Sequence, residues 1–590
     1  NYIIEGKAEI WLENDEGVVE KTIMTSGDFF TVRPPKKHRV IAITDIILQE
    51  VSTPEVDDVV RLSDDAKRSD GRLDYEHMTP ALCILAAGVG SRMGEYGKHI
   101  NKGLLPIDNL AIISHSINKV PKDYEIIIAL GYKSNQVKEY CSAIHPDRNI
   151  KFIKIEDYTG KKSGPGTSLL ACKDHLQRPF YFVTADCLVD EDFPEIGNWL
   201  GVHPTSIPEI YSTVKIEDGM ISSFVNKSPD GFDYAFIGLC AIRDYEIFWN
   251  QLEKNIKDTG EMVCAFYDPK KYPSLEAKTF KWHDIGTIEN YLKVHNELEN
   301  EKLGIPKTSG QFIYKLDGKV TKLFQKNVKN SVERVKNLDK IAPKITYSGE
   351  NVFSYDWIDG KTLYKRPEKI KEFMKWSYKN LWTKEGVSIS SECYKFYKEK
   401  TYSRFELFLN KKSNSLNLRE RFLINGKECL SIDDYLGMIE WSDICETHIT
   451  TKLFHGDLQF DNIIVTKSDK FKIIDWRDSF GNQSTYGDVY YDLAKLYGGM
   501  MMNYSLVKDP KNYSFVMFDN QVDFSFPGIS SEYFSKEDFI DWCQQKGFNF
   551  NKIEKLTALI YLNMSPLHDQ DLDNILYFNS IKMLSDIYDD

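Results

Sequence analysis

The sequence has no long hydrophobic run, because no stretch approaches the roughly twenty consecutive apolar residues that span a bilayer. It also has no C-x-x-C pair: its ten cysteines are scattered, which indicates reduced thiols and no structural zinc site. An excess of positive charge is missing too, since the net charge is −13. This balance argues against nucleic acid or an anionic membrane as the main partner. We see no signal peptide, although the chain starts at Asn1 rather than Met, and we expect a cytoplasmic protein.

What is present fits a large enzyme with several domains. At 590 residues the chain is too long for one hydrophobic core, so two to four domains are expected. The apolar share of 42%, with 13% aromatic residues, is enough to fill those cores. We therefore predict an α/β multidomain protein.

A glycine-rich turn follows a buried strand in the first third of the chain. The apolar run Leu82–Ala87 leads into Gly88-Val89-Gly90-Ser91-Arg92-Met93-Gly94. Glycines at such a turn let backbone N–H groups approach phosphate oxygens, and Arg92 can add a bidentate fork. Two common phosphate motifs are missing. A dinucleotide fingerprint needs glycine where Met93 stands, and a P-loop needs Gly-Lys-Ser/Thr.

This turn resembles the signature of the sugar-phosphate and phosphocholine type of nucleotidyltransferase, Leu-Ala-Ala-Gly-x-Gly-Ser-Arg-Met, which a lysine follows. That lysine is Lys102 here, and Asn101 stands where the family usually has proline. The resemblance implies that Arg92 and Lys102 are catalytic. It also implies nucleotide contacts at four positions of the turn: Ala87, Gly88, Gly90 and Ser91.

Later parts of the same family pattern follow in order. Ser163–Leu169 resembles the loop that contacts the nucleobase, through Gly166 and Thr167. The strand Tyr181–Ala185 ends in Asp186, and Trp282–Thr287 contains Asp284; by resemblance these two aspartates hold Mg²⁺. Lys227 stands where relatives carry a lysine for the acceptor phosphate. Strands and helices alternate between Glu125 and Ala185, with a strand expected at Glu125–Leu130 and a helix at Ser168–His175. We therefore expect a mostly parallel, doubly wound sheet.

A second catalytic pattern lies near the C-terminus. Phe454-His455-Gly456-Asp457 is followed by Asn462, and a second apolar strand ends in Asp475-Trp476. Transfer of a phosphoryl group from ATP needs one carboxylate to orient the hydroxyl, plus an amide and a carboxylate that hold magnesium. The set resembles the choline kinase and aminoglycoside phosphotransferase family. The resemblance gives Asp457 the catalytic role and makes Asn462 and Asp475 the metal ligands.

Upstream residues extend this resemblance to a bilobal, kinase-like α+β domain. A hairpin over residues 313–324 carries Lys322 as the predicted phosphate-binding lysine, and Glu333 is its expected partner. Tyr355–Gly360 resembles the hinge between the lobes. A glycine loop is poorly represented, with Thr308-Ser309-Gly310 as the candidate. Asp488 and Asp492 are expected to buttress the metal loop or to cap a helix.

The first eighty residues alternate like strands and resemble the second half of a cupin of the mannose-6-phosphate isomerase type. The paired histidines of that family would lie before residue 1, so His38 alone is expected to be structural. The polar run Ser63–Thr79 reads as a linker, and Gly304-Ile305-Pro306 as a second one. The predicted domains are 1–79, 80–303 and 304–590.

Together these patterns predict an enzyme that acts in two steps. The C-terminal domain phosphorylates a small alcohol with ATP. The middle domain then joins the phosphate to a nucleoside monophosphate from a second NTP, with CTP favoured, and releases pyrophosphate. One alternative is a sugar kinase fused to a sugar-phosphate nucleotidyltransferase that uses UTP, CTP or GTP. Another is that one catalytic domain serves only as a regulatory binding module. By resemblance, such fusions belong to capsule or lipopolysaccharide synthesis. The expected partners are small molecules, with no nucleic acid or membrane insertion, and the cupin part is a possible site of homo-oligomer assembly.

Overall fold

The computed structural model of the chain describes residues 1–52, 60–63, 65, 78–160, 163–256, 260–298, 310–338, 341–412 and 417–589. It forms two compact units, Asn1–Pro80 and Ala81–Asp590. The predicted linker Gly304-Ile305-Pro306 and the predicted boundary at 303/304 lie outside the described residues, as does most of the predicted linker Ser63–Thr79.

The N-terminal unit is built from two small antiparallel sheets. The first has the order β3-β2-β4 and the second pairs β1 with β5. Their strands are β1 (Tyr2–Glu5), β2 (Lys7–Glu13), β3 (Val19–Thr25), β4 (His38–Ala42) and β5 (Ile47–Gln49). The small core contains Ile3, Ala8, Ile10 and Phe30. The alternation that predicted strands here is confirmed, while the resemblance to a cupin stays a prediction.

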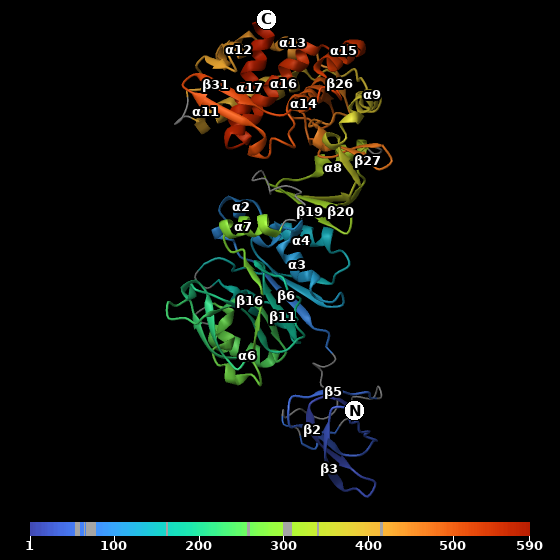
Figure 1. Cartoon of the computed structure of the whole chain (residues 1–590), viewed down its shortest axis with the longest axis vertical. Coiled ribbons are helices and arrows are strands. Elements are labelled where there is room, and N and C mark those ends of the chain that lie inside the picture. The colour runs from blue at the N-terminus through green and yellow to red at the C-terminus, as the bar shows by residue number, and fades with distance from the viewer. Residues whose placement is uncertain are drawn as a thin grey trace. The chain divides into compact units, whose positions relative to one another are not determined.

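The second unit begins with the region 81–298, which we call the middle region; it contains one large mixed sheet (Figure 1). Its order is β10-β9-β6-β11-β16-β13-β17-β15-β14, and the first four of these strands are parallel neighbours. Their bounds are Ile150–Lys154, Glu125–Leu130, Ala81–Ala86 and Phe180–Thr184. The other five are β16 (Tyr234–Ile242), β13 (Trp199–Pro204), β17 (Glu276–Thr279), β15 (Met220–Asn226) and β14 (Ser212–Glu217). The expectation of a mostly parallel sheet is confirmed for that half only, because β16 runs antiparallel to β11 and most later pairs are antiparallel.

Both faces of this sheet are covered, as a doubly wound fold requires. Alternate residues of β6 belong to different cores: Leu82 and Ile84 pack in one, and Cys83 and Leu85 in the other. Because every side chain of β6 is buried, the strand reads as one continuous apolar run rather than as an alternating one. The covering helices are α3 (Ile112–Asn118), α4 (Ser134–Ile144), α5 (Pro165–Leu170), α6 (Tyr245–Asn255) and α7 (Ile288–Leu298).

The rest of the second unit, residues 310–589, we call the C-terminal region. It starts with an antiparallel sheet in the order β19-β20-β22-β21, with helix α8 (Lys329–Asn337) in the same segment. The strands are β19 (Gln311–Leu316), β20 (Lys319–Phe324), β21 (Ile345–Ser348) and β22 (Val352–Asp356). The predicted hairpin around Asp317-Gly318 is therefore confirmed. A mostly helical body follows, while the assignment of a bilobal kinase-like domain stays a prediction.

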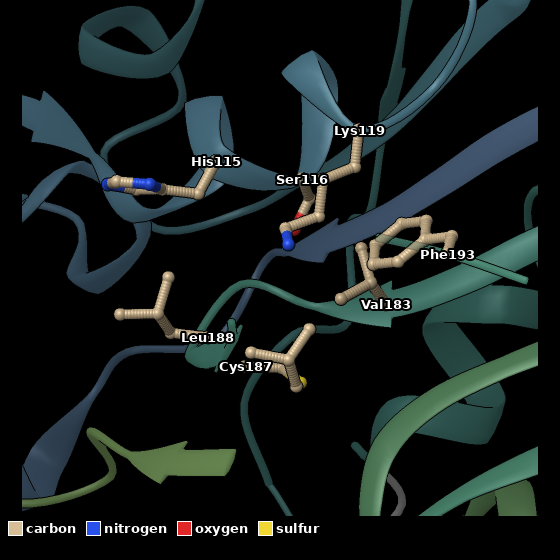
Figure 2. A pocket seen from close by; sticks show the side chains of 8 residues that line it. His115, Ser116, Lys119, Val183, Cys187, Leu188 and Phe193 are labelled. Atoms are coloured by element: carbon tan, nitrogen blue, oxygen red, sulfur yellow. The ribbon is translucent and has the colours of Figure 1, made fainter. Parts of the chain in front are cut away.

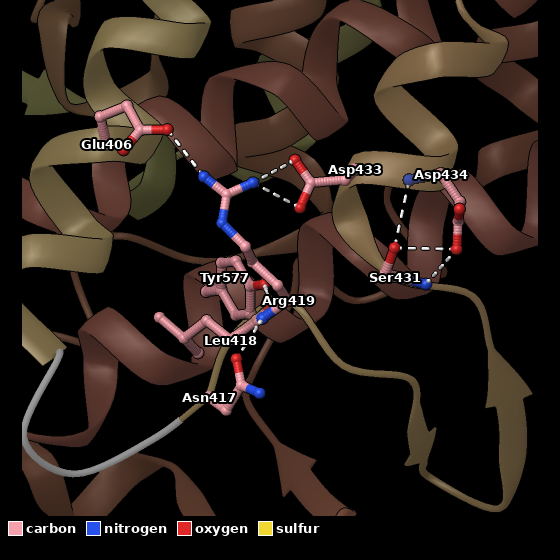
Figure 3. Close-up of polar contacts among 8 residues, drawn as sticks. All are labelled: Glu406, Asn417, Leu418, Arg419, Ser431, Asp433, Asp434 and Tyr577. Carbon is pink, nitrogen blue, oxygen red and sulfur yellow. Dashed lines mark hydrogen bonds and ion pairs between the residues drawn. The ribbon is translucent and has the colours of Figure 1, made fainter.

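The helical body holds the second set of motifs. Its main helices are α9 (Ile370–Asn380), α11 (Lys400–Lys412), α12 (Ile432–Met438), α14 (Val489–Met501), α15 (Lys536–Lys546), α16 (Phe550–Met564) and α17 (Asp571–Tyr588). A small sheet, β23-β27-β28 (Gly360–Thr362, Ile463–Thr466, Phe471–Ile473), carries the motif loops. Two contacts fix the entry into α12 (Figure 3): Arg419 bridges Asp433 and Glu406, and Ser431 forms a capping box with Asp434.

Within the described part of the chain, no helix is both long and apolar enough to cross a membrane.

Two candidate active sites

The glycine turn after β6 needs glycine at its centre. Gly90 adopts φ +67°, in the left-handed region that glycine enters at little cost, and the short helix Ser91–Met93 starts directly after it. A Cβ at Gly90 would lie 3.5 Å from the Cβ of Lys102, so the turn runs close to the lysine segment. The sequence prediction that this turn and Lys102 form one site agrees with this placement.

Lys102 faces the end of strand β11. Its Nζ lies 2.6 Å from Oδ2 of Asp186, the residue that follows the strand. Gly103 makes this approach possible, since a Cβ there would lie 2.8 Å from the Ile113 side chain and 3.0 Å from the Ala185 Cβ. Burial acts to raise the pKa of Asp186, but the ion pair with Lys102 outweighs it, and the pKa lies below its usual value. Asp186 is therefore a carboxylate near neutral pH.

Asn101 is the residue that departs from the family pattern, and it ties three segments together. Its amide donates to the carbonyl oxygens of Ala86 and Tyr132, each at 2.9 Å, and its carbonyl accepts from the Gly103 N–H at 3.0 Å. The side chain is 1% exposed. These bonds fix the lysine segment against the ends of β6 and β9.

Asp284 is brought beside Asp186 by a short antiparallel pair. Strands β12 (Cys187–Val189) and β18 (Trp282–Asp284) place Cys187 opposite Asp284. The Asp284 carboxylate accepts hydrogen bonds from the Tyr211 hydroxyl at 2.8 Å, the Asn290 amide at 3.1 Å and the Gly286 N–H at 2.8 Å. Two predicted metal ligands 98 positions apart in the chain thus meet at one end of the sheet.

Arg92 belongs to the same group. A Cβ at Gly286 would lie 3.6 Å from a guanidinium nitrogen of Arg92, so its side chain reaches the loop that follows Asp284. Burial, and next the hydrogen bond to Asp284, raise the pKa of Tyr211, whereas the charge of Arg92 acts to lower it. The site therefore joins two carboxylates, one arginine and one lysine.

These residues fit a magnesium ion. No group of three His, Cys, Asp or Glu side chains that could form a complete protein cage occurs among the described residues. Mg²⁺ usually binds one or two carboxylates and completes its shell with water and substrate phosphates. Asp186 and Asp284 supply that donor set.

The predicted nucleobase loop and the predicted acceptor lysine lie in another part of the middle region, beside Glu261. Gly166 opens α5, and a Cβ there would lie 2.8 Å from the backbone of Glu261. Lys227, at the end of β15, pairs with Glu261 at 3.0 Å and is exposed. The loop and the lysine thus share a neighbour in Glu261, while the roles of Gly166, Thr167 and Lys227 stay predictions.

A narrow gap lies between α3 and the segment Val183–Val189 (Figure 2). His115, Ser116 and Lys119, on and next to α3, face Val183, Cys187 and Leu188 across it. It leaves no room for a water molecule. We therefore assign it to core packing rather than to a ligand.

Asp492 holds the motif loop of the C-terminal region, which contains His455, Gly456 and Asp457. The backbone N–H groups of His455 and Gly456 donate to its two oxygens at 2.9 and 2.7 Å. His455 is buried, contacts the Ile474 carbonyl through Nε2, and accepts from the Asp457 N–H at 3.1 Å. Burial raises the pKa of Asp492 to about 6, against the effect of these hydrogen bonds. The predicted buttressing role of Asp492 is confirmed, and Asp488 caps α14.

The predicted catalytic residue Asp457 and the two predicted metal ligands of this region converge. Asn462 donates to the backbone oxygen of Asp457 at 2.9 Å. Asp457 is paired with Lys495 of α14 at 2.8 Å, and Asp475 is paired with Lys322 of β20. Asp475 adopts φ +62°, which turns the chain sharply after β28. One amide and two carboxylates at one place fit the donor set expected for Mg²⁺ with nucleotide phosphates.

One sequence prediction is corrected here. Glu333 was expected to pair with Lys322, yet Glu333 is exposed on α8, whereas Lys322 is 4% exposed and pairs with Asp475. The inward residue of α8 is its neighbour Arg334, which contacts the backbone oxygens of Phe454 and Ser484. Arg334, and not Glu333 as expected, is therefore the residue of α8 that points towards the motif loop.

Several residues of both sites were missed from sequence. Tyr211 and Asn290 hold Asp284, and Lys495 holds Asp457. None of them lies inside a recognisable motif. Lys495 carried a signal, because a lysine three residues after Asp492 on one helix points to the same side.

Comparison with known proteins identifies relatives of the middle region. Residues 82–193 match the model of the MobA-like NTP transferase domain, a span that contains Arg92, Lys102 and Asp186. The chain is 27% identical over 225 residues to the bifunctional protein GlmU of Methanocaldococcus jannaschii, covering 36% of this chain and 53% of that protein. GlmU of Methanococcus vannielii is 23% identical over 243 residues, covering 38% and 56%. The chain spans about half the length of these relatives.

Solved structures also resemble part of the chain. One is CTP:phosphocholine cytidylyltransferase from Streptococcus pneumoniae, at 16% identity and a TM-score of 0.32, covering 38% of this chain and 100% of that one. Another is UDP-glucose pyrophosphorylase complexed with UDP-glucose, at 18% identity and a TM-score of 0.32, covering 37% and 98%. The family match supports a nucleotidyltransferase domain in the middle region. The kinase-like and cupin-like assignments stay predictions.

Proposed function

We propose that the protein activates a small alcohol in two steps. The C-terminal region transfers a phosphoryl group from ATP to the alcohol, and the middle region couples the resulting phosphate to a nucleoside monophosphate. For the donor of the second step we propose CTP, in keeping with the resemblance to phosphocholine-type nucleotidyltransferases. The observation that carries the proposal is the convergence of Lys102, Asp186 and Asp284 beside the glycine turn.

In the nucleotidyl transfer, an oxygen of the acceptor phosphate attacks the α-phosphorus of the NTP. A bond forms between them, the bond from the α-phosphorus to the bridging oxygen breaks, and pyrophosphate leaves. The attacking oxygen is already anionic, so no protein base is needed. Arg92 and Lys102 offset the charge of the triphosphate, and the N–H groups of the glycine turn position it. Asp186 and Asp284 would hold Mg²⁺, which supplies further charge neutralisation at the phosphates.

Lys102 changes partner during this step. Its Nζ is paired with Asp186 at 2.6 Å. The two groups keep each other in place, since each would otherwise be a charge in a partly buried setting. When a triphosphate and its cation arrive, both partners have a new counter-charge within reach.

In the phosphoryl transfer, Asp457 orients the alcohol and accepts its proton as the oxygen attacks the γ-phosphorus of ATP. The bond between the γ-phosphorus and the oxygen that bridges it to the β-phosphate breaks, and ADP leaves. Asn462 and Asp475 would hold Mg²⁺, and Lys322 lies at Asp475 where it can reach the phosphates. The ion pair of Lys495 with Asp457 fits this role, because it keeps the carboxylate ionised.

The pKa of Asp457 supports that assignment. Burial acts to raise it, and the charge of Lys495 lowers it below its usual value. Near neutral pH the group is a carboxylate, which suits orientation of a hydroxyl and acceptance of its proton during transfer.

The test uses the full chain with Mg²⁺ and each of the four NTPs, together with a panel of phosphorylated alcohols. Pyrophosphate release is the readout for the middle region. In a second arm, ATP and the free alcohols are supplied, and ADP is the readout for the C-terminal region. Release of pyrophosphate in the first arm and of ADP in the second supports both halves. Without pyrophosphate from any pair, the proposed second step would be refuted.

A further inference from the structure

Basic side chains gather around Asp457 in the C-terminal region. They come from three separate segments: Lys400 and Arg404 start α11, Arg477 follows β28, and Lys495 lies in α14. The charges of Arg477, Lys495 and Arg404 all act on the ammonium group of Lys400, and Asp457 is the carboxylate that acts on it. Lys400, Arg477 and Lys495 are therefore basic groups close to Asp457, where the alcohol hydroxyl must lie, and Arg404 lies next to Lys400 and Arg477.

The ring of Phe396 lies against two of these basic side chains. The Nζ of Lys400 lies 4.1 Å from its centroid, and the guanidinium carbon of Arg477 lies 5.0 Å from it. Phe396 is buried against Phe480 and Tyr491. It belongs to a π-helical turn, Tyr394–Glu399, that ends where α11 begins. Such turns are rare and often occur at functional sites.

These bases are poorly neutralised by the protein itself. Lys495 pairs with Asp457, but no described carboxylate forms an ion pair with Lys400, Arg404 or Arg477. The Nε of Arg477 is buried and has no hydrogen-bond partner. Burial lowers the pKa of Lys400 to about 6, and the neighbouring Arg477 adds to this effect. These side chains are partly buried, and partly buried arginines without a counter-charge are disfavoured, so the arrangement favours an anion, whose binding would also restore the charged form of Lys400.

Three aromatic side chains that could bind a quaternary ammonium already contact other groups of the protein. Tyr490 faces Lys552, whose Nζ lies 4.2 Å from the ring centroid, and Trp357 faces Lys315 at 4.0 Å. Trp382 packs against Trp542 and Phe548 in the core. The aromatic content of this region therefore gives no support to a choline-like substrate.

We propose that the alcohol phosphorylated here carries an anionic group of its own, a carboxylate or a phosphate, which Lys400 and Arg477 bind over the ring of Phe396. This inference rests on the proposed kinase activity and specifies its substrate class. Asp457 receives the hydroxyl proton, the alcohol oxygen bonds to the γ-phosphorus, and ADP leaves, as for any alcohol. The anionic group stays unchanged and sets the orientation.

The same oxyanion chemistry could come from the triphosphate of ATP, so the experiment separates the two sources. The full-length protein is assayed for ADP release with D-glycerate and glycerol 3-phosphate as anionic alcohols, glycerol as the neutral one and choline as the cationic one. Variants are Lys400→Gln and, as a matched control on the preceding turn, Lys398→Gln, whose ammonium lies near Trp441 instead. We expect an anionic alcohol to exceed glycerol and choline at least tenfold in kcat/KM. Lys400→Gln should raise the KM for that alcohol about tenfold and leave the KM for ATP unchanged.

A binding experiment tests the proposal without knowledge of the natural alcohol. Inorganic phosphate is titrated into the protein saturated with a non-hydrolysable ATP analogue and Mg²⁺, and we expect a binding event that Lys400→Gln weakens and Lys398→Gln keeps. A preference for choline, an effect of Lys400→Gln on the KM for ATP alone, or phosphate binding that ignores Lys400 would each overturn the proposal. Failure of the kinase assignment itself looks different: the ATP analogue would then bind with no dependence on Lys322, as a Lys322→Ala variant would reveal.

Discussion

The two candidate sites are positioned by different chemistry. In the middle region, the lysine segment is held by the neutral amide of Asn101, which bonds to Ala86, Tyr132 and Gly103. In the C-terminal region, the Asp457 loop is held by the carboxylate of Asp492, which is 0% exposed and accepts from two backbone N–H groups. An amide does not titrate, whereas a buried carboxylate does. Similar fixation of a loop therefore carries a pH dependence in one site and none in the other.

The sites also differ in how their acidic groups are balanced. Asp284 is satisfied by neutral donors, and Asp186 has one lysine. Asp457 and Asp475 each have a lysine, and further bases surround Asp457. The middle site is therefore suited to bringing a cation to a triphosphate. The other site has positive charge left over for a second anion.

The largest effects are expected from the two metal-ligand candidates of the middle region. Asp186→Asn and Asp284→Asn should each abolish pyrophosphate release, because an amide is a poor substitute for a carboxylate that holds Mg²⁺ against a triphosphate. ADP production by the C-terminal region should stay largely intact. Asp190→Asn is the matched control, since this neighbouring aspartate is exposed and pairs with Lys281. Near-normal nucleotidyl transfer in either variant would show that the metal assignment is wrong.

Asp457→Ala tests the other site. Orienting and proton-accepting roles contribute about a hundred- to ten-thousand-fold in rate, so consumption of the free alcohol should fall by that factor. Supplying the phosphorylated alcohol should restore full nucleotidyl transfer, because the middle region uses only the phosphate. ADP and pyrophosphate are measured separately.

Asp461→Ala in the same loop serves as the control for Asp457→Ala, since Asp461 pairs with Lys508. Normal phosphorylation by Asp457→Ala would contradict the kinase assignment. A failure of the phosphorylated alcohol to restore transfer would show that the two sites do not act in sequence.

Asp492→Asn tests whether the residue that holds the Asp457 loop titrates, in contrast to Asn101, which holds the lysine segment and cannot titrate. The pKa of Asp492 is raised to about 6 from an ordinary value of 3.8. The stability that its protonated form contributes is therefore fully present below about pH 4 and is lost as the pH rises through 6. The shift of about two units corresponds to roughly 3 kcal/mol. The advantage of the wild type over Asp492→Asn in free energy of unfolding should fall by that order between pH 4 and 7.

Urea unfolding followed by tryptophan fluorescence at several pH values measures this difference. A difference between the two proteins that is constant with pH would mean that Asp492 does not titrate in this range in the folded protein.

Asn101→Ala is the counterpart in the middle region. It removes two donors and one acceptor from a buried network and leaves the carbonyls of Ala86 and Tyr132 without this partner, at a cost of about 1–3 kcal/mol. Since an amide has no charge to lose, the cost should be the same at pH 5 and pH 7. Thermal unfolding at both pH values is the measurement. A strong pH dependence would break the proposed contrast.

Sequence patterns were enough for the elements that carry strong periodicity. The strand Glu125–Leu130 was predicted with its observed bounds, and the motif strands β6 and β11 were found within one residue. The helix expected at Ser168–His175 instead begins at Pro165 and stops at Leu170, because proline suits the first turn and a 3₁₀ turn follows. Local pattern fixes the type of an element better than its ends.

Side-chain partners were harder to predict, because they depend on tertiary packing. Glu333 and Arg334 are adjacent on α8, and a rotation of one residue decides which of them faces the motif loop. The antiparallel half of the large sheet was missed for a similar reason. Strands β14, β15 and β17 lack a continuous apolar run, and the pairing in this half of the sheet joins segments far apart in the chain.

The smallest effect is expected from His38→Ala. His38 is exposed at the start of β4, and no group of three metal-binding side chains that could include it occurs among the described residues. A single imidazole cannot hold a metal firmly, so neither pyrophosphate nor ADP release should change. Metal content is measured on the purified protein and on the variant, together with both activities. Stoichiometric metal that disappears with His38, or the loss of either activity, would contradict a purely structural role of His38.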